Sequence, residues 1–273
     1  MIETDNDTLN KLHEILIEIL DEFVRICNEN NFTYFLTCGT LLGAVRHNGF
    51  IPWDDDIDIG MPRDDYEKLI KYFDHNNENY YLLSYKTKNN AGKYNLNFIK
   101  LCKKGTVFAE SLKDIQSYSG IFIDIFPFDN CYIFLTGLQA FLIRFILNIY
   151  RVKVDAIYKR GIIYYITKAL CIFLPIKIIK FLYQNIHVLY KKGNYLSYMS
   201  SVYGYKRETH KYNTVFPLSS IVFERKHYYV PNDYDSYLNT MYGNYMELPP
   251  ENERHTHLPE YIVFDDKISQ EPF

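Results

Sequence analysis

Apolar side chains recur at helical spacing near the start of the chain. In residues 8–28 they occupy every third or fourth position, as expected of a helix with one buried face. Asp7 or Thr8 can cap the first turn, and the polar run NENN at residues 28–31 ends the periodic segment. The pattern predicts that the helix buries Leu9, Leu12, Leu16, Ile19, Phe23 and Cys27.

The next 100 residues alternate between strand-like and helix-like patterns. Strands are predicted at residues 32–38, 50–61, 97–104 and 120–128, and helices at 39–47 and 66–73. Pro52 lies near the start of the second strand, and Asp64 or Asp65 can cap the second helix. We therefore expect an α+β fold with a mixed sheet, flanking helices and a helical insertion.

From residue 131 the chain becomes apolar and basic. Residues 131–150 and 162–190 are helix-like, but charged side chains interrupt both before about 20 uncharged residues accumulate, so no membrane-spanning helix is expected. Residues 144–192 contain ten Lys or Arg and one acid, Asp155, which makes this segment +9 and leaves −12 for the rest of a chain of net charge −3. Such a segment can lie on an anionic membrane surface, or it can pack on the core with a solvated basic face.

We expect three parts in the chain: a catalytic core at residues 1–130, the basic apolar helical region at 131–195, and a C-terminal part at 196–273 that completes the cleft. The net charge argues against a general nucleic-acid-binding protein. The five scattered cysteines suit a reducing compartment, and the acidic start MIETDND is not a secretory signal. We therefore expect a cytoplasmic protein, with peripheral contact to the inner face of the membrane through residues 131–192 as a further expectation.

Four aspartates in five positions, DDDID at residues 54–58, give the strongest chemical signal. In a strand, Asp54, Asp56 and Asp58 share one face, and their like charges repel unless a cation lies between them. Carboxylate oxygens favour Mg²⁺ or Mn²⁺. A helix cap, an acidic loop and the Asp-x-Asp of a glycosyltransferase are alternatives at this point.

Two further features fit a metal and phosphate site. Gly39 and Thr40 lie between a predicted strand and a predicted helix, where backbone N–H groups and a hydroxyl can hold phosphate oxygens. Asp124 is the only acid in the apolar run 120–128, and a buried carboxylate needs a partner charge. A Gly-containing turn, an Asp-x-Asp strand and a third carboxylate together match the nucleotidyltransferase arrangement, in which the turn holds phosphates and the aspartates hold Mg²⁺.

Other residues near these motifs are weaker candidates. Arg46 and His47 end the predicted helix 39–47, where they can stabilise phosphate charge or hold the acidic segment in place. Lys100 is a phosphate candidate but is more typical of a solvated strand residue. We expect Trp53 to pack under the acidic segment, and the tyrosines of residues 234–245 to be available for a quaternary ammonium.

Three segments carry a resemblance to a known family. They are TCGTLLGAVRHNGFIPWDDDIDIGMPRDDYEKL at residues 37–69, GIFIDIFPFD at 120–129, and VPNDYDSYLNTMYGNYMELPPENERHTH at 230–257. In sequence, order and spacing they resemble the LicD family of phosphotransferases, which includes the fukutin-related proteins. The resemblance covers most of the chain outside residues 131–192.

The resemblance implies a nucleotidyltransferase-like fold and a metal-dependent transfer of a phospho-alcohol, most typically phosphocholine from CDP-choline. The acceptor would be a hydroxyl of a cell-surface or lipid-linked glycan, such as lipopolysaccharide, teichoic acid or capsule, and CMP would be released. The implied ligands of Mg²⁺ or Mn²⁺ are Asp56, Asp58 and Asp124. The implied catalytic residues are these three with Arg46 and His47, and the implied substrate-binding residues are Gly39, Thr40, Arg254, His255 and His257.

Two other functions stay open. A metal-dependent glycosyltransferase or nucleotidyltransferase of surface polysaccharide assembly would use a nucleotide-sugar or an NTP as donor. A non-catalytic, membrane-associated partner in glycan assembly would keep its role after Asp58→Ala. The donor consumed and the nucleotide released distinguish all of these functions.

Overall fold

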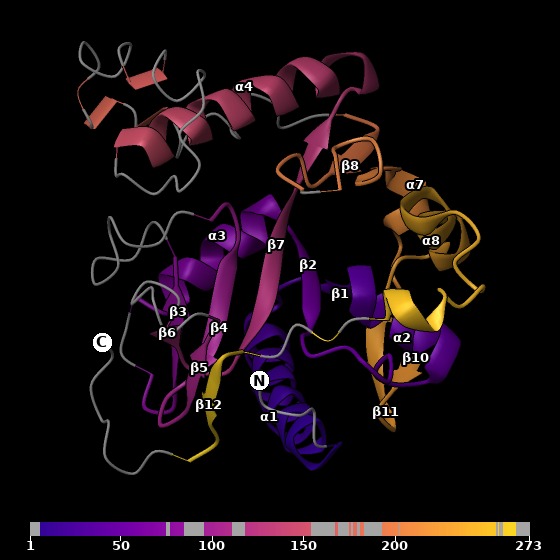
Figure 1. Cartoon of the computed structure of the whole chain (residues 1–273). Helices are drawn as coiled ribbons and strands as arrows, with labels where there is room; N and C mark the ends of the chain where they lie inside the picture. The colour runs from indigo at the N-terminus through magenta and orange to yellow at the C-terminus, as the bar shows by residue number, and fades with distance from the viewer. Residues whose placement is uncertain are drawn as a thin grey trace.

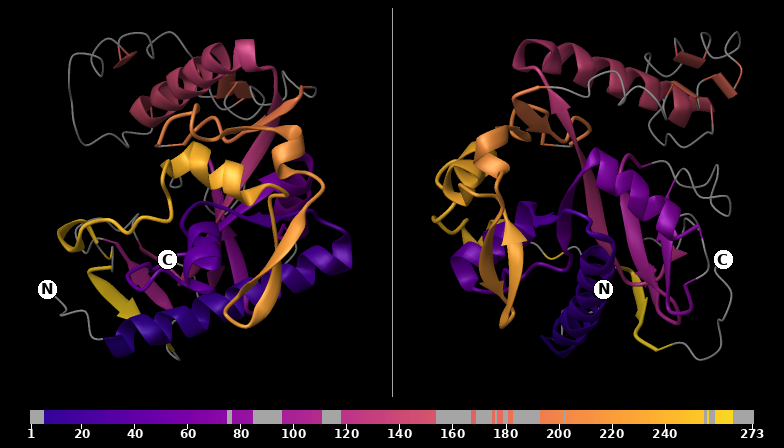
Figure 2. Two further views of the ribbon diagram at one scale, coloured as in Figure 1. Left: turned by 90° about the vertical axis from the view of Figure 1, so that its right-hand side faces the viewer. Right: turned by 180° about the vertical axis from the view of Figure 1, so that it is seen from behind.

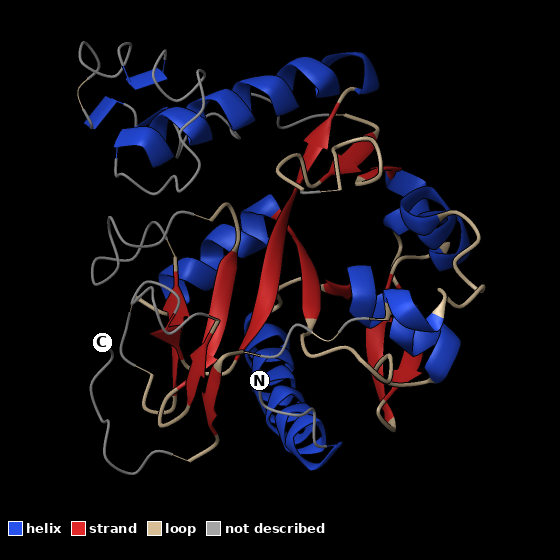
Figure 3. Ribbon diagram, in the orientation of Figure 1, coloured by secondary structure: helices blue, strands red, loops and turns tan. Residues whose placement is uncertain are grey.

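A computed structural model describes residues 6–74, 77–84, 96–110, 118–153, 193–201, 203–254, 256 and 259–265, together with short pieces at 167–168, 175, 177–178 and 181–182. Helices and strands in these residues assemble around one mixed sheet (Figure 1, Figure 3). The expected α+β fold with flanking helices is confirmed.

The central sheet has seven strands. Five lie side by side in the order β1 (Phe35–Leu36), β2 (Asp58–Pro62), β7 (Phe122–Cys131), β4 (Ile99–Lys103) and β3 (Tyr80–Leu83). Strands β2 and β7 are parallel, and the other neighbours are antiparallel. The last residues of β7 pair with β8 (Tyr195–Ser197), which pairs with β9 (Thr209–Lys211). The C-terminal third thereby joins the sheet of the aspartates, and the division into three parts stays a prediction.

The remaining elements surround this sheet. A hairpin is formed by β10 (Ser219–Phe223) and β11 (Lys226–Val230), and a small sheet by β12 (Tyr261–Val263), β5 (Val107–Ala109) and β6 (Tyr118–Ser119). The helices are α1 (Asn6–Asn30), α2 (Cys38–His47), α3 (Arg63–Tyr72), α4 (Ile133–Lys153), α7 (Tyr212–Val215), α8 (Tyr234–Tyr242) and the short 3-10 helix η4 (Glu251–Glu253). Figure 2 shows α4 lying across one end of the molecule, beyond the end of β7.

Helix α1 buries the predicted stripe. All six apolar positions are at most 8% exposed, and the helix contacts β4 and β7. The helix begins at Asn6, so neither Asp7 nor Thr8 lies at its N-cap, and that prediction is wrong. Leu12 and Leu16 of α1 line a cavity together with Asp55 and Asp56, so this face of the helix lies beside the acidic segment.

The second strand is shorter than predicted. The backbone N–H of Asp54 donates to the carbonyl of Ile51 at 2.9 Å, which closes a turn with Pro52 in its second position. Strand β2 begins only at Asp58. The prediction that Asp54 and Asp56 share a strand face with Asp58 is therefore wrong, because both precede the strand.

The other predicted elements are present with shifted ends. Helix α3 begins at Arg63, so Asp64 and Asp65 lie in its first turn and not at its cap. Asp65 instead accepts a hydrogen bond from the backbone N–H of Thr33, at 2.9 Å. Helix α2 and strands β1, β4 and β7 lie within or close to their predicted ranges.

Helix α4 confirms the first predicted helix of the apolar region. Its Ala140 and Ile143 are buried, while five large apolar side chains of the helix are exposed: Ile133, Phe134, Leu138, Phe141 and Phe145. The second predicted helix, residues 162–190, lies mostly outside the described residues. In the part of the chain that the structure describes, no helix combines the length and apolar character needed to cross a bilayer.

Candidate active site

The register of the central sheet places three charged residues in one row. Asp58 of β2 is the pairing partner of Asp124 of β7, and Asp124 is the partner of Lys100 of β4. Residues opposite one another in adjacent strands project from the same face of a sheet. The two predicted aspartates therefore lie side by side, and a lysine completes the row.

The start of α2 holds Asp58 in place. The backbone N–H of Gly39 donates to Oδ2 of Asp58 at 3.2 Å, and the backbone N–H of Asp58 donates to Oγ1 of Thr40 at 2.7 Å. A Cβ atom on Gly39 would lie 2.8 Å from Oδ2 of Asp54, so only glycine lets this turn approach the acidic segment so closely. The Gly-Thr turn thus positions carboxylates, and its predicted phosphate contact stays a prediction.

Burial and crowding raise the pKa values of these carboxyl groups. Loss of solvent is the largest cause for each of them, and the charge of Asp56 adds to it. The pKa of Asp54 rises to about 8 and that of Asp124 to about 7, where Lys100 opposes the rise, and the pKa of Asp58 lies well above its usual range. Asp56 therefore lies within electrostatic reach of the other three.

These carboxylates fit a divalent cation. Oδ1 of Asp124 is buried and has no hydrogen-bond partner, and the oxygens of Asp56 and Asp58 are hard ligands of the kind that Mg²⁺ prefers. Within the described residues, no three His, Cys, Asp or Glu side chains already form a metal-ligand group. The residues that would hold the ion are Asp56, Asp58 and Asp124, and their side chains would turn toward it as the mutual repulsion is relieved.

Lys100 is buried, and its prediction as a solvated strand residue is wrong. Only 7% of the residue is exposed. Its Nζ lies 3.1 Å from Oε1 of Glu110, 3.8 Å from Oδ1 of Asp124, and 3.4 Å from the ring centroid of Phe122. The ammonium group therefore sits at the site of the carboxylates, where it can meet the oxygens of a bound phosphate.

A cavity of about 400 Å³ opens beside this row. Acidic, basic and apolar side chains line it together: Leu12, Leu16, Asp55, Asp56, Lys100, Phe108, Glu110, Ile121, Phe122 and Asp124. Two of the three proposed metal ligands are among them. The cavity can therefore hold part of a charged substrate against the carboxylates.

Arg46 and His47 connect α2 to the chain that follows α8. Nε of Arg46 donates to Nε2 of His47 at 3.0 Å, and its Nη1 donates to the carbonyl of Tyr245 at 2.9 Å. Burial is the main reason that the pKa of Arg46 is lowered, and the charge of Arg254 contributes, while Asp54 opposes the shift. Arg46 therefore lies near the acidic segment and has a structural contact, and its catalytic role stays a prediction.

Arg254 also reaches the acidic segment. Its guanidinium carbon lies 5.1 Å from the ring centroid of Trp53, and its Nε donates to the carbonyl of Pro249 at 3.0 Å. Trp53 is partly buried and packs against the core, as expected. His255 and His257 lie outside the described residues, so their predicted roles are not tested.

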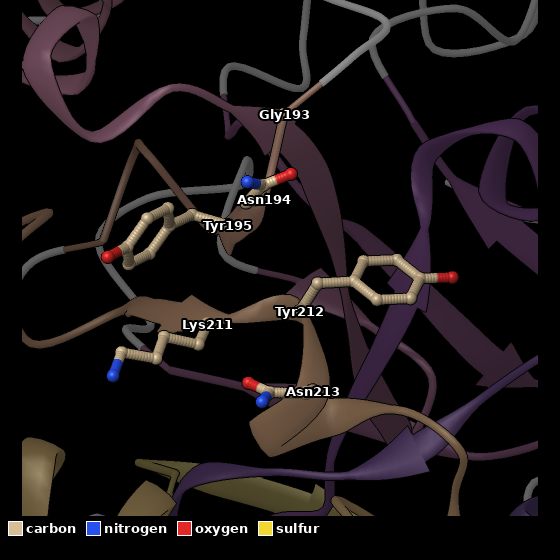
Figure 4. Close-up of a pocket in the computed structure, with 6 residues that line it drawn as sticks. All are labelled: Gly193, Asn194, Tyr195, Lys211, Tyr212 and Asn213. Atoms are coloured by element: carbon tan, nitrogen blue, oxygen red, sulfur yellow. The ribbon is translucent and has the colours of Figure 1, made fainter.

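A second cavity, of about 570 Å³, lies where β8 and β9 meet α7. Figure 4 shows its six residues, with Tyr195 and Tyr212 pointing to opposite sides. None of the predicted site residues lines it. The carboxylate row, and not this cavity, is therefore the candidate active site.

Comparison with known proteins agrees with this placement. Residues 31–137, which contain α2, β2 and all of β7, match the family model described as LicD/FKTN/FKRP, nucleotidyltransferase domain. The chain is also 30% identical over 267 residues to the lipopolysaccharide cholinephosphotransferase LicD of Haemophilus influenzae, a match that covers 92% of this chain and 96% of that protein. The chain belongs to the LicD family.

Shorter matches concern other members of the wider group. An uncharacterized protein of Rickettsia typhi is 39% identical over 61 residues, which is 21% of this chain and 20% of that protein. One of Rickettsia prowazekii is 46% identical over 50 residues, which is 18% of this chain and 19% of that protein. Membership of the LicD family confirms the prediction of an enzyme, a transferase, with a nucleotidyltransferase-like fold.

Sequence reasoning missed one buried acid of this LicD-family chain. Glu208 precedes β9 and is only 1% exposed. Its Oε1 accepts hydrogen bonds from the hydroxyl of Ser201 at 3.1 Å and from the thiol of Cys38 at 3.9 Å. Cys38 is the neighbour of Gly39, so Glu208 lies close to the turn that holds Asp58. Its surroundings in the sequence, YKRETHKY, are polar and give no signal of burial.

Proposed function

We propose that this chain transfers phosphocholine from CDP-choline to a hydroxyl of a cell-surface glycan, in a reaction that needs Mg²⁺ or Mn²⁺ and releases CMP. The acceptor that the comparison favours is lipopolysaccharide, because the relative that matches over 96% of its length is a lipopolysaccharide cholinephosphotransferase. The observation that supports the proposal is that Asp58 and Asp124 lie opposite one another on neighbouring strands in a chain of the LicD family.

The reaction exchanges the phosphoanhydride bond of the donor for a phosphoester bond to the acceptor. The acceptor oxygen forms a bond to the phosphorus that carries choline, the bond from that phosphorus to the bridging oxygen breaks, and CMP leaves with the bridging oxygen. A bound divalent cation would neutralise phosphate oxygens and the charge that develops on CMP. The buried ammonium of Lys100 is placed to contact a phosphate oxygen in the same step.

The acceptor hydroxyl must also lose a proton. Asp124 lies in the carboxylate row beside Lys100 and lines the cavity, where its carboxylate oxygens can meet the acceptor hydroxyl. It is therefore our candidate for the group that receives the proton. Asp58, which Gly39 and Thr40 hold in place, would position the donor relative to Asp124.

The test is a donor panel with the purified protein. CDP-choline, CDP-ribitol, CDP-glycerol, UDP-sugars and NTPs are each incubated with Mg²⁺ or with EDTA, in the presence of an acceptor-containing envelope extract, and the nucleotide products are measured by mass spectrometry. We expect CMP to be released from CDP-choline in the samples with Mg²⁺ and not in the samples with EDTA. Release of UDP would replace the proposal with glycosyl transfer, and release of pyrophosphate would replace it with nucleotidyl transfer.

Matched variants show whether the carboxylates carry the reaction. Asp58→Asn and Asp124→Asn should each lower the rate of CMP release by roughly a hundredfold or more, the scale of losing one preorganised charge contact. Asp64→Asn in α3 is the control, because Asp64 is an exposed acid of the same kind. Equal rates for Asp58→Asn and the control would remove the assignment of Asp58.

A further inference from the structure

Glu208 is a buried carboxylate without a cationic partner among its contacts. The two groups that donate to its Oε1, the hydroxyl of Ser201 and the thiol of Cys38, are both neutral, and Oε2 is buried without a hydrogen-bond partner. No ion pair among the described residues includes Glu208. Burial raises the pKa of Glu208 to about 7, and the cost of burying its charge is relieved either by a proton or by a positive charge that joins it.

Two tyrosines lie near this carboxylate. The ring centroids of Tyr203 and Tyr242 are 6.5 Å apart with an edge-to-face angle of 72°. Burial is the main cause that raises the pKa of both phenols, and the charges of Asp58 and Glu208 raise both further. The geometry agrees, because the backbone N–H of Tyr203 donates at 3.1 Å to the hydroxyl of Ser201, which itself donates to Glu208, and Tyr242 packs against the Tyr203 ring. Tyr203 is 55% exposed, so this pair also reaches solvent.

Glu208 and the cavity beside Lys100 lie toward opposite ends of the same strand face. Phe122, Asp124 and Phe126 alternate along β7 and so share one face. Phe122 lines the cavity with Lys100, whereas Phe126 packs against Tyr198, at 5.0 Å between ring centroids. The backbone N–H of Tyr198 donates to the carbonyl of Glu208 at 3.1 Å, so Glu208 lies toward the Phe126 side of Asp124.

The two sides differ in charge. The ammonium of Lys100 already occupies the Phe122 side, where it lies 3.4 Å from the ring centroid and pairs with Glu110, so the face of this ring is not free for a second cation. The Glu208 side offers a carboxylate and two tyrosine rings. A quaternary ammonium has no N–H to donate, so it is held by aromatic faces and by nearby negative charge.

We infer that Glu208, Tyr203 and Tyr242 form the subsite for the trimethylammonium group of the donor, on the opposite side of Asp124 from Lys100. The inference rests on the proposed function, since it takes phosphocholine as the transferred group. In this arrangement the phosphates lie at the Asp58 and Asp124 row, and the cationic head lies on the rings of Tyr203 and Tyr242, within electrostatic reach of the buried carboxylate of Glu208.

The test compares CDP-choline with CDP-3,3-dimethylbutanol, a donor of the same shape in which carbon replaces the charged nitrogen. For the unaltered protein we expect kcat/KM for CMP release to favour CDP-choline by roughly tenfold or more, from the charge and the aromatic contacts. In Glu208→Gln this preference should fall to about twofold or less. Glu78→Gln is the control, because Glu78 is an exposed glutamate.

Two variants of Tyr203 test the subsite without changing a buried group, because Tyr203 is largely exposed. They are Tyr203→Leu and Tyr203→Phe. The leucine variant should lose part of the preference for the charged donor, and the phenylalanine variant should keep it because the ring remains. An equal loss of kcat/KM for both donors in Glu208→Gln, or an unchanged preference, would overturn the inference. A lack of CMP release from every CDP-alcohol by the unaltered protein would instead refute the proposed function.

Discussion

Lys100 and Asp124 form a contact between opposite charges at the point where phosphate oxygens are expected. Their side chains are 9% and 12% exposed, and 3.8 Å separates Nζ from Oδ1. At that distance and burial the ammonium both stabilises the ionised carboxylate and remains available to an incoming phosphate. We therefore expect Lys100 to contact the phosphate as well as to stabilise the row of charged residues.

Lys100→Met should lower kcat for CMP release by roughly a hundredfold or more, because one buried charge that meets the phosphoryl group is lost while the length of the side chain is kept. Lys104→Met, at an exposed position just after β4, is the matched control. Steady-state assays with CDP-choline measure both variants. A Lys100→Met variant that keeps the kcat of the control, with a similar melting temperature, would limit Lys100 to packing.

Substitutions at two glycines are expected to affect catalytic activity and folding stability separately. Gly39→Ala would place a Cβ atom 2.8 Å from the flexible carboxylate of Asp54, whereas Gly60→Ala would place one 2.5 Å from the ring of Phe35 inside the core. We expect the first variant to fold but to lose most of its activity, and the second to lose about 1–3 kcal/mol of unfolding free energy through overpacking. Urea unfolding and CMP release, measured on both, check the division; the reverse pattern would contradict it.

At the scale of elements, local signals predict some features well and others poorly. The stripe of α1 and the apolar run of β7 are strong patterns, and the structure has both. The acidic segment is different, because Pro52 is compatible both with the start of a strand and with the second position of a turn. The backbone hydrogen bond from the N–H of Asp54 to the carbonyl of Ile51 shows that it lies in a turn. Nothing in the alternation of Asp and Ile near residue 57 reveals this choice.

A prediction at the scale of elements concerns the exposed apolar side chains of α4. The segment 144–192 carries a charge of +9, which complements an anionic bilayer, so contact with such a surface stays a prediction for this helix. Phe141→Ser with Phe145→Ser should lower the partition constant on vesicles containing anionic lipid by roughly tenfold or more, since two large apolar side chains no longer enter the interface. Sedimentation of vesicles with bound protein measures the effect.

The matched control for this test is Met246→Ser with Leu248→Ser, which removes two exposed apolar side chains after α8. It should bind vesicles as the unaltered protein does. Equal binding by both double variants would remove the membrane interpretation of α4.

At the scale of the whole molecule, the site depends on register that no single segment contains. Asp58 could be predicted because it belongs to a cluster of four aspartates, and Asp124 because it is the only acid in the apolar run 120–128. Lys100 could not be assigned, because its burial follows only from the pairing of β4 with β7. Glu208 reaches the turn at Cys38 across 170 residues of sequence, a separation at which local patterns carry no information.

The same long-range crowding makes the stability of the metal-free protein depend on pH. A carboxyl with a raised pKa binds its proton more tightly in the folded than in the unfolded chain. Its contribution is fully present below the unfolded pKa, near 3.8 for Asp124, and is lost as the pH rises through the folded pKa of about 7. Asp124→Asn cannot lose a proton there, so its stability relative to the unaltered protein should increase between about pH 4 and pH 8.

We expect the melting temperature of metal-free Asp124→Asn to exceed that of the unaltered protein by about 3 °C or more at pH 8, which corresponds to roughly 1 kcal/mol for a chain of this size, and the difference to be smallest near pH 4. Mg²⁺ should raise the melting temperature of the unaltered protein but have less effect on the variant, because binding to the folded state alone stabilises it. Asp64→Asn serves again as the exposed control. A difference between Asp124→Asn and the unaltered protein that stays constant with pH, or a Mg²⁺ effect that is equal in both, would contradict a buried carboxylate site that a divalent cation neutralises.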